Sequence, residues 1–284
     1  MHGKTVVITG ANGGIGKETA IALARQGARV IIAVRDPVRG ASAVTDIIGR
    51  SGSTNVEQLA LDLASIASIR AFATTLATKT DQLSVLINNA GVILRRRQTT
   101  ADGFEMTFGV NHLGHFLLTE LLHDLLERGA PSRIVVVASD AYKGARRGLD
   151  FDDLNLEHSR YGPFRAYCRS KLANILFTRE LARRLDGSGV TANAVHPGVV
   201  ATRLASDGDT GRLGDLAMTL ARPFFKTPEQ GARTSIYVAS APELESITGA
   251  YFAESLPMPT KKQAIDMVAA RRLWDASKEL LRDR

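Results

Sequence analysis

The chain has 284 residues, of which 44% are hydrophobic and 23% are charged, so it is long enough to bury a large core. Its one cysteine, Cys168, excludes an internal disulfide framework and favours a reducing compartment. The formal net charge is +7, but the basic residues form short, scattered clusters without a nucleic-acid-binding motif, so we expect solvated surfaces and no nucleic-acid partner.

The ends and the hydropathy of the chain predict a soluble protein. No basic leader precedes an apolar segment, and no apolar run reaches about 18 residues. We therefore expect a cytoplasmic location and no membrane span. Nothing between residues 4 and 252 has the composition of a linker, so residues 1–284 are predicted to form a single domain.

Short runs of β-branched and apolar residues alternate with longer segments of helical period. The strand-like runs are 5–9, 29–34, 56–61, 85–87, 134–137 and 191–195. The helical segments include 15–26, 65–78, 112–126 and 166–185. Strands that are apolar on both faces and separated by helices are typical of a parallel sheet covered on both sides. The pattern predicts a doubly wound α/β fold whose ligand lies at the carboxyl ends of the strands.

A glycine-rich turn, TGANGGIGKETA, follows the first strand-like run and contains Gly10, Gly14 and Gly16. Such glycines permit a tight turn and the close approach of a pyrophosphate, whose charge then meets the free N–H groups of a helix N-terminus. A glycine-rich loop alone is a weak signal. Here it stands between a strand and a helix, which is the context that a dinucleotide site requires.

The end of the second strand-like run, IIAVRDP, bears on the choice between NAD and NADP. An acidic residue there would hold the ribose 2′-hydroxyl of NAD, but Val34 and Arg35 occupy the place. Arg35 can bind the 2′-phosphate of NADP through charge-assisted hydrogen bonds, and Lys17 can add to the attraction. Asp36, with Pro37 after it, fits a helix cap. We expect NADP(H) to be preferred, with NAD(H) as the alternative.

Tyr167 and Lys171 lie four residues apart in AYCRSKLANILF, so a helix would place both on one face. The spacing alone is also typical of an exposed turn with a cation near a phenol. An ammonium beside the phenol favours the phenolate and would bring the pKa of Tyr167 toward a value useful in general acid/base catalysis. We interpret the pair as a candidate proton-transfer site.

Five motifs occur in order along the chain: TGANGGIGK, NNAG at 88–91, VNHLGHFLL at 110–118, IVVVAS at 134–139 and YCRSK at 167–171. Together they resemble the short-chain dehydrogenase/reductase family. The later segments HPGVVAT, TPEQGARTSIYVAS, ITGAYF and RRLWDASKEL are similar to its retinol dehydrogenase-like branch. The resemblance covers nearly the whole chain and implies a Rossmann fold with one seven-stranded parallel sheet.

The resemblance also implies a catalytic tetrad of Asn111, Ser139, Tyr167 and Lys171. In this tetrad Ser139 stabilises charge on the substrate oxygen, Tyr167 exchanges a proton with that oxygen, and Asn111 holds a water that links Lys171 to solvent. The cofactor-binding residues lie at strand ends, with Asp62 beside the adenine and Val199 and Thr202 at the nicotinamide. The full cofactor set is Gly10, Asn12, Gly14, Ile15, Gly16, Arg35, Asp62, Leu63, Asn89, Ala90, Gly91, Tyr167, Lys171, Pro197, Gly198, Val199 and Thr202.

Two features depart from the common family pattern. The family often has paired serines where this chain has Ala138, Ser139 and Asp140, so a charge stands next to the implied catalytic hydroxyl and is expected to change the polarity of the pocket. The segment between Ser139 and Tyr167 is long. It forms either a wall of the substrate site or a surface loop.

Other conspicuous residues have ordinary interpretations. His112 and His115 lie three apart in a helical segment without an evident third ligand, so we expect structural roles and no metal site. A small packed thiol is expected for Cys168, and Trp274 is expected to anchor the last helix.

Segment 203–226 follows the implied nicotinamide loop and mixes large apolar residues with glycine and aspartate. We interpret it as a lid with an apolar underside, which suits a lipophilic aldehyde, ketone or alcohol, and a static helix over the core is the alternative. Retinol dehydrogenases commonly carry an N-terminal membrane segment, whereas this chain begins its first strand almost at once.

The main functional hypothesis is a soluble NADP(H)-dependent oxidoreductase that acts on a small-molecule carbonyl or alcohol. The alternative is a redox-sensing regulator that binds the nucleotide on the same fold and then a protein or DNA. The proton relay favours the enzyme, because a sensor does not need one. The sequence leaves open the direction of the reaction and whether the chain forms a homo-oligomer.

Overall fold

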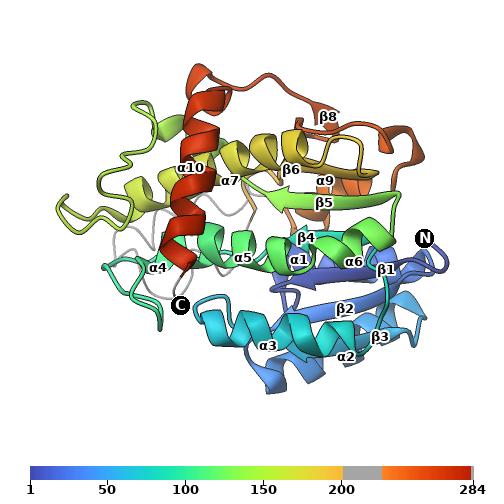
Figure 1. The fold of residues 1–284 in the computed structure, drawn as a ribbon. Coiled ribbons are helices and arrows are strands. Elements are labelled where there is room, and N and C mark those ends of the chain that lie inside the picture. Colours follow the sequence, from blue (N-terminus) through green and yellow to red (C-terminus); the bar gives the residue numbers. More distant parts are fainter. Residues whose placement is uncertain (201–225, 283–284) are drawn as a thin grey trace.

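The computed structural model describes residues 1–200 and 226–282, which build one open sheet with helices on both faces (Figure 1). The strand order is β3-β2-β1-β4-β5-β6-β7-β8. The strands are β1 (Thr5–Thr9), β2 (Arg29–Val34), β3 (Val56–Ala60), β4 (Val85–Asn88), β5 (Ser132–Val137), β6 (Val190–His196), β7 (Tyr251–Ala253) and β8 (Leu256–Pro257). The predicted doubly wound α/β fold is confirmed, and each of the six predicted strands is present.

The sheet has one strand more than the seven predicted, and it is not entirely parallel. β8 is an antiparallel edge of two residues that returns along β7, whereas β1 to β7 pair in parallel. Glu254 and Ser255 make the turn with φ values of 52° and 61°. Two residues, one of them Pro257, are too few to show a periodic pattern, so the sequence carries no signal for this strand.

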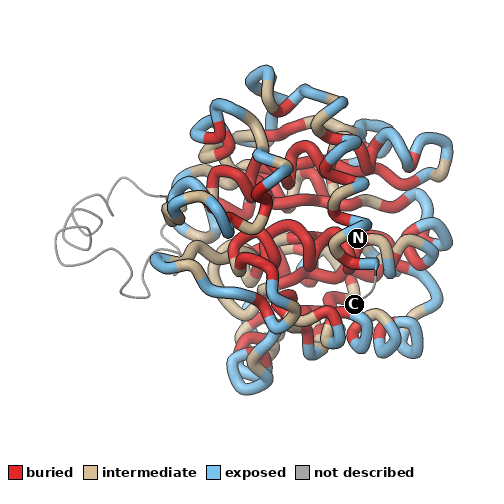
Figure 2. The backbone as a smooth tube through the Cα atoms, turned by 60° about the vertical axis from the view of Figure 1, so that its left-hand side comes forward, coloured by how far each residue is buried: buried red, intermediate tan, exposed pale blue. Residues whose placement is uncertain are grey.

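Two groups of helices cover the two faces of the sheet. α1, α2 and α9 pack on one face, and α3, α5, α6, α7 and α10 pack on the other. Successive strand residues point to opposite faces, so Val6 and Ile8 join the first layer and Val7 joins the second. Figure 2 shows that the buried segments fill the middle of the molecule. None of the helices in the described part of the chain is long and apolar enough to cross a membrane.

The helices and short helical turns begin and end as follows. They are α1 (Gly14–Arg25), α2 (Pro37–Ser51), α3 (Ile66–Ala77), α4 (Met106–Phe108), η1 (Gly109–Leu113), α5 (Gly114–Leu121), α6 (His123–Arg128), η2 (Asp140–Gly144), α7 (Pro163–Arg184), α9 (Pro228–Ser240), η5 (Pro242–Leu244), η6 (Lys262–Ala264) and α10 (Met267–Leu281).

The predicted helix 112–126 differs most from the structure. The helical segment begins six residues earlier, at α4, and continues through the five-residue π-helical turn η1, then α5 and α6. Gly109 begins the π turn and Gly114 follows it. A Cβ at Gly114 would lie 2.6 Å from the Leu63 carbonyl oxygen, and one at Gly109 would lie 2.5 Å from Thr100 Cγ2. Both positions therefore have no room for a side chain, and apolar periodicity carries no signal for the π turn between them.

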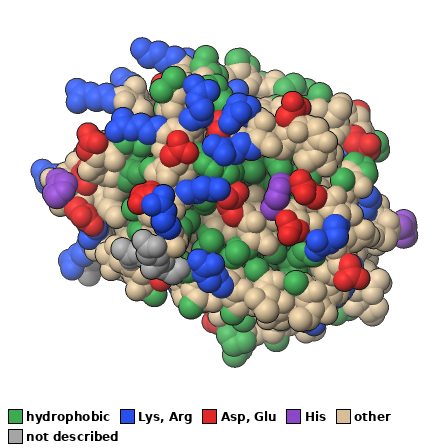
Figure 3. Space-filling view, viewed as in Figure 1, with side chains coloured by type: hydrophobic (Ala, Val, Ile, Leu, Met, Phe, Trp, Pro, Cys, Tyr) green, Lys and Arg blue, Asp and Glu red, His purple; other side chains and the backbone are tan. Residues whose placement is uncertain are grey.

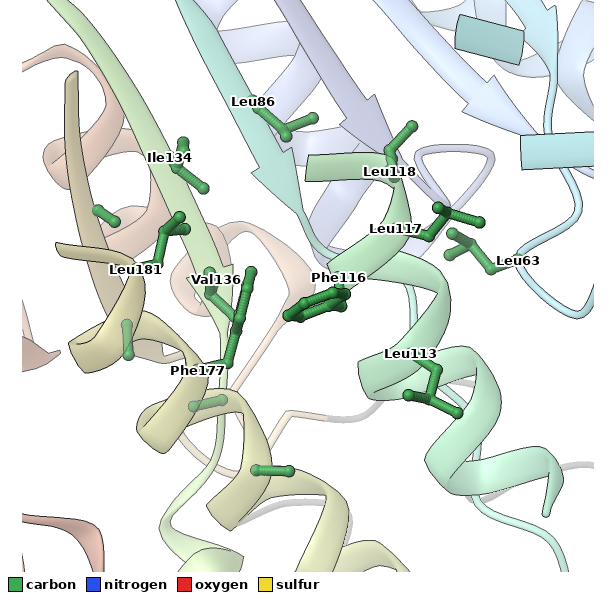
Figure 4. Close-up of a cluster of buried hydrophobic side chains, with 14 of the residues drawn as sticks. Leu63, Leu86, Leu113, Phe116, Leu117, Leu118, Ile134, Val136, Phe177 and Leu181 are labelled. Carbon is green, nitrogen blue, oxygen red and sulfur yellow. The ribbon is translucent and has the colours of Figure 1, made fainter. Parts of the chain in front are cut away.

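The C-terminal helix α10 is anchored as predicted by Trp274, which is 4% exposed. Its ring stacks on Phe177 of α7 at 5.9 Å and meets Phe116 of α5 edge-on at 4.8 Å. Figure 4 shows Phe116 and Phe177 pointing toward one another between these helices. Cys168, also on α7, is buried as expected. The aromatic cluster fastens α10 across α5 and α7, the helix that carries Tyr167 and Lys171.

The basic surface is interspersed with acidic side chains. Lys and Arg gather over α10 and its surroundings in the upper left of the view, with Asp and Glu among them (Figure 3). Arg272 lies 3.4 Å from Asp152, and Lys278 lies 3.2 Å from Glu120. These exposed ion pairs fit the solvated surfaces that the short basic clusters predicted.

We predict that Trp274→Ala lowers the free energy of unfolding by about 3–5 kcal/mol, because a large buried ring is replaced by a cavity. Urea denaturation followed by circular dichroism measures the change. Val268→Ala, on the exposed side of the same helix, is the control and should change stability by at most about 0.5 kcal/mol. Equal stability of the two variants would show that α10 does not depend on this anchor.

Candidate active site

The glycine turn forms a cradle with unoccupied backbone donors. Gly10 and Gly14 have φ values of 68° and 54°, a region that favours glycine. Within residues 1–200 and 226–282 no side chain caps the start of α1 after Gly13, whereas Asp36 caps α2 through the N–H groups of Val38 and Arg39. The first N–H groups of α1 are therefore left for another acceptor. The cap interpretation of Asp36 is confirmed.

The NNAG segment packs directly against this turn. A Cβ on Gly16 would lie 2.5 Å from Asn89 Nδ2, and one on Gly10 would lie 2.9 Å from Ala90 Cβ. Asn89 Nδ2 donates to the Thr9 carbonyl oxygen at 2.7 Å. The two segments thus fit together only because glycines stand at both contacts, and the structure brings these predicted cofactor residues side by side.

Arg35 and Lys17 differ in what they contact. Arg35 is exposed just beyond the end of β2, and within the described residues its side chain has no hydrogen bond or ion pair. Lys17 Nζ lies 2.6 Å from Asp46 Oδ2. The guanidinium of Arg35 is therefore available to an anion, while the ammonium of Lys17 is paired with Asp46.

Asp62 and Leu63 lie after β3, at the same edge of the sheet. Asp62 Oδ1 accepts a hydrogen bond from the N–H of Ala64 at 2.9 Å, and its own N–H donates to Ser68 Oγ at 2.9 Å. These bonds fix the turn that follows the strand. Leu63 is 8% exposed and its carbonyl oxygen faces Gly114.

Tyr167, Lys171 and Ser139 come together where α7 passes the end of β5. Lys171 Nζ lies 5.5 Å from the centre of the Tyr167 ring and donates to the Val137 carbonyl oxygen at 2.8 Å. Ser139 is hydrogen-bonded to Tyr167. Ser139 Oγ also accepts the N–H of Ala141 at 3.2 Å, which orients it at the start of η2. The predicted spacing therefore places phenol, ammonium and hydroxyl in one group.

Asn111 lies in the π turn η1, close to Lys171. A Cβ on Gly91 would lie 3.4 Å from Asn111 Oδ1 and 3.7 Å from Lys171 Nζ, so both groups meet at this glycine. Asn111 Nδ2 donates to the Val92 carbonyl oxygen and to Ser170 Oγ, both at 3.0 Å. Asn111 Oδ1 accepts the N–H of Val92 at 2.7 Å. Both amide donors are thus used inside the protein.

Burial sets the proton affinities of the Tyr–Lys pair. It raises the pKa of Tyr167 to about 12, although the hydrogen bond with Ser139 acts in the opposite direction. It lowers the pKa of Lys171 to about 8. The expected lowering of the Tyr167 pKa by the ammonium is not seen, because removal of water from the phenol dominates and the ammonium is directed to a backbone carbonyl.

The charge of Asp140 is already matched by its neighbours. Tyr251 Oη donates to Asp140 Oδ1 at 2.9 Å, and Lys143 Nζ donates to Oδ2 at 2.7 Å. Burial opposes the charge, but these two bonds hold the pKa of Asp140 below its ordinary value. Its backbone N–H donates to His196 Nδ1 at 3.3 Å. Asp140 therefore bonds the start of η2, directly after Ser139, to β6 and β7.

The long segment between Ser139 and Tyr167 is fastened to its surroundings. Arg169, which is 6% exposed, donates from Nη2 to the carbonyl oxygens of Asp150 and Asp153 at 3.0 and 2.7 Å. Tyr161 Oη donates to the Leu94 carbonyl oxygen at 2.9 Å, in the loop after β4. These contacts join two loops that follow the carboxyl ends of β4 and β5, so the segment is held at the same edge of the sheet as Ser139.

The loop after β6 is described only in part. Pro197 is partly buried and Val199 is 63% exposed. Gly198 has a φ of 87°, and a Cβ there would lie 2.8 Å from Lys226 Cδ. Thr202 and the predicted lid, apart from Lys226, lie outside the described residues.

The two histidines make internal hydrogen bonds. His112 Nε2 lies 2.9 Å from Ser277 Oγ of α10, and His115 Nε2 lies 2.9 Å from Thr9 Oγ1. No group of three or more His, Cys, Asp or Glu within residues 1–200 and 226–282 is arranged to hold a metal ion. Thr9 was missed from sequence, and its position directly before Gly10 at the end of a strand is the one signal that points to it.

Comparison with known sequences identifies the class of this arrangement. A family model described as enoyl-(acyl carrier protein) reductase matches residues 10–253. Human retinol dehydrogenase 14 is 49% identical over 295 residues, which cover 99% of this chain and 87% of that protein. Human retinol dehydrogenase 12 is 50% identical over 281 residues, with the same two coverages of 99% and 87%.

Solved structures agree with the sequence comparison. An uncharacterized protein from Mycobacterium paratuberculosis is 38% identical, with a TM-score of 0.79 and coverage of 99% of this chain and 94% of the other. Pseudomonas aeruginosa RhlG, in a complex with NADP, is 26% identical with a TM-score of 0.69, covering 89% and 94% of the two chains. The fold and site define a dinucleotide-binding oxidoreductase. The chain belongs to the short-chain dehydrogenase/reductase family, in its retinol dehydrogenase-like branch.

The depressed pKa of Lys171 predicts a pH dependence of stability. An unfolded lysine titrates near pH 10.4, whereas folded Lys171 titrates at about 8. Between these values the unfolded chain binds the extra proton, so the free energy of unfolding rises with pH, by on the order of 3 kcal/mol in all.

Urea denaturation across this pH window should show the rise in the wild type and a flatter curve in Lys171→Met. Lys262→Met, at an exposed lysine, should keep the wild-type slope; equal slopes in all three proteins would contradict the assignment.

Proposed function

We propose that the protein is an NADP(H)-dependent oxidoreductase that interconverts a carbonyl group and an alcohol on a lipophilic small molecule, with Tyr167 as the general acid/base. The observation that carries the proposal is the meeting of Tyr167, Ser139 and Lys171 at the carboxyl edge of the sheet. Membership of an oxidoreductase family supports the enzyme over a redox-sensing regulator.

The glycine cradle fits the pyrophosphate of a dinucleotide. The uncapped start of α1 offers N–H groups, and side chains at Gly10 or Gly16 would fill the space beside the NNAG segment. The residues that would line the cofactor are those of the family set, from Asn12 and Ile15 at the turn to Gly91, Pro197, Gly198 and Val199 further along the edge. When bound, the nicotinamide supplies or accepts the hydride.

Arg35 is proposed to select NADP(H). An exposed guanidinium without a protein partner can bind a 2′-phosphate through charge-assisted hydrogen bonds, and no carboxylate at the end of β2 is free to take a 2′-hydroxyl, because Asp36 caps α2. The likeness to RhlG, solved with NADP, supports the same choice.

The proton chemistry follows from the burial of the pair. With its pKa raised to about 12, Tyr167 is protonated at neutral pH and can donate to a carbonyl oxygen as negative charge develops there. Ser139 can donate a second hydrogen bond to the same oxygen. Lys171, with a pKa of about 8, gains and loses a proton near physiological pH and can restore the phenol's proton. Both N–H groups of the Asn111 amide already donate inside the protein. A water that joins Lys171 to solvent would therefore donate its hydrogen bond to the side-chain oxygen of Asn111.

A lipophilic substrate is supported by apolar side chains near the phenol. Phe164 is 65% exposed and lies one helical turn before Tyr167, on the same side of α7. Val199 is exposed at the same edge. A lid over residues 203–226, a single domain over 1–284, a cytoplasmic location and a homo-oligomer remain predictions.

We predict that Tyr167→Phe keeps NADPH binding and loses turnover by roughly 10²- to 10⁴-fold, because the ring stays and the transferable proton goes. NADPH consumption with a panel of aldehydes and ketones, retinal included, measures turnover. Tyr237→Phe, in α9, is the matched control and should retain activity. Substantial reductase activity in Tyr167→Phe would refute the role of the phenol; tight cofactor binding by the wild type with no substrate reduced would favour the regulator.

Arg35→Ala is expected to weaken NADPH binding by roughly 10- to 100-fold and to leave NADH binding within about 2-fold, because only NADPH carries the 2′-phosphate. Dissociation constants from nucleotide fluorescence test this. Arg25→Ala, at the far end of α1, removes an equal charge and should affect neither cofactor. Tighter binding of NADH than NADPH by the wild type would overturn the proposed preference.

A further inference from the structure

His115 is a buried titratable group that the proposed chemistry does not use. It lies on α5 with an exposure of 2%. Its Nε2 lies 2.9 Å from Thr9 Oγ1 at the end of β1, and its Nδ1 lies 3.2 Å from the Asn111 carbonyl oxygen in the π turn. One imidazole therefore connects the strand that leads into the glycine turn with the turn that carries Asn111.

The hydroxyl of Thr9 determines which way these bonds run. It accepts the N–H groups of Asn89 and Ala90, both at 2.9 Å, which occupies both of its lone pairs. Its single proton can then go to His115 Nε2 at 2.9 Å or to the Ile87 carbonyl oxygen at 3.4 Å, and the shorter contact is the better bond. His115 Nε2 must therefore accept, and Nδ1 must carry the proton that is donated to Asn111.

This arrangement requires a neutral imidazole. A protonated His115 would present a second N–H to a Thr9 oxygen that has no lone pair left. Burial lowers the pKa of His115 to about 4, and the Lys171 ammonium acts in the same direction. His112, one turn earlier, is the other titratable group beside it, and burial holds its pKa at about 3. The Nδ1–H form is thus maintained at neutral pH.

We propose that His115 is a positioning residue for the cofactor site: as the Nδ1–H tautomer it orients the Thr9 hydroxyl, which holds the backbone of Asn89 and Ala90 against the glycine turn. The inference rests on the proposed function. The tolerance at this contact is small, because a Cβ on Gly10 or Gly16 would already lie within 2.9 Å of these two residues. A shift of the NNAG backbone therefore disturbs the N-terminus of α1.

His112 provides a matched comparison. It is equally buried, at 1% exposure, and makes one hydrogen bond, to Ser277 Oγ of α10. That bond leads away from the glycine turn. Loss of the His112 bond should therefore reduce stability without affecting the cofactor, whereas loss of the His115 bond should affect both.

The test measures NADPH dissociation constants for the wild type, Thr9→Val, His115→Phe and Ser277→Ala. We expect Thr9→Val and His115→Phe to weaken binding by roughly 5- to 100-fold, since buried N–H groups lose their acceptor or its orientation. Ser277→Ala should lower the melting temperature and leave the dissociation constant within about 2-fold. The Thr9→Val/His115→Phe double variant should bind no more weakly than Thr9→Val, because both act through one hydroxyl.

A second measurement is independent of the cofactor and of any variant's folding. Long-range ¹H–¹⁵N spectra of the wild type labelled at histidine should show His115 with its proton on Nδ1 and an unprotonated Nε2. A proton on Nε2, or unchanged NADPH binding in a folded Thr9→Val variant, would overturn the inference. A wild type that shows the expected tautomer but binds no NADPH would instead count against the proposed function.

Discussion

The site depends on the parallel register of the central strands. β1 pairs with β4 so that Ile8 faces Ile87, and β4 pairs with β5 so that Asn88 faces Val136. Parallel strands with this register end at one edge, so the glycine turn, the NNAG segment and Ser139 are delivered to the same place from points far apart in sequence. Without that common edge, none of the short contacts at Gly10 and Gly16 would exist.

Burial at this edge is the largest cause of the pKa shifts of Tyr167, Lys171 and His115. Removal of water raises the pKa of Tyr167 and lowers those of Lys171 and His115, so all three favour neutral forms more than they would in water. In the proposed mechanism, a phenol that holds its proton is the donor, and an amine whose pKa is lowered to about 8 supplies the next proton. The same burial keeps His115 as a hydrogen-bond acceptor toward Thr9. One physical effect therefore acts on both the proposed proton path and the proposed cofactor turn.

Much of the fold and of the candidate site could be predicted from the sequence, because each of these parts is marked by residue types that lie close together in the chain. β-branched runs mark the inner strands, glycines mark close backbone approaches, and helical spacing aligns Tyr167 with Lys171. β8 and the π turn could not be predicted, because the first is two residues long and the second lies inside a helical segment whose apolar period does not mark it. The link between His115 and Thr9 joins residues 106 positions apart, so only tertiary contact reveals it.

The substrate side is built on different principles from the cofactor side. A pyrophosphate needs backbone N–H donors, and a flat nicotinamide needs space. Glycines provide both, so the sequence indicates where the cofactor would bind. The segment proposed as a wall of the substrate site instead depends on particular side chains, such as Arg169 holding two carbonyl oxygens and Asp140 bonded to Tyr251 and Lys143. These contacts fix the segment between Ser139 and Tyr167 to both β7 and α7. In the proposed enzyme, exchange of these few side chains would alter the substrate side and leave the residues at the strand ends in place.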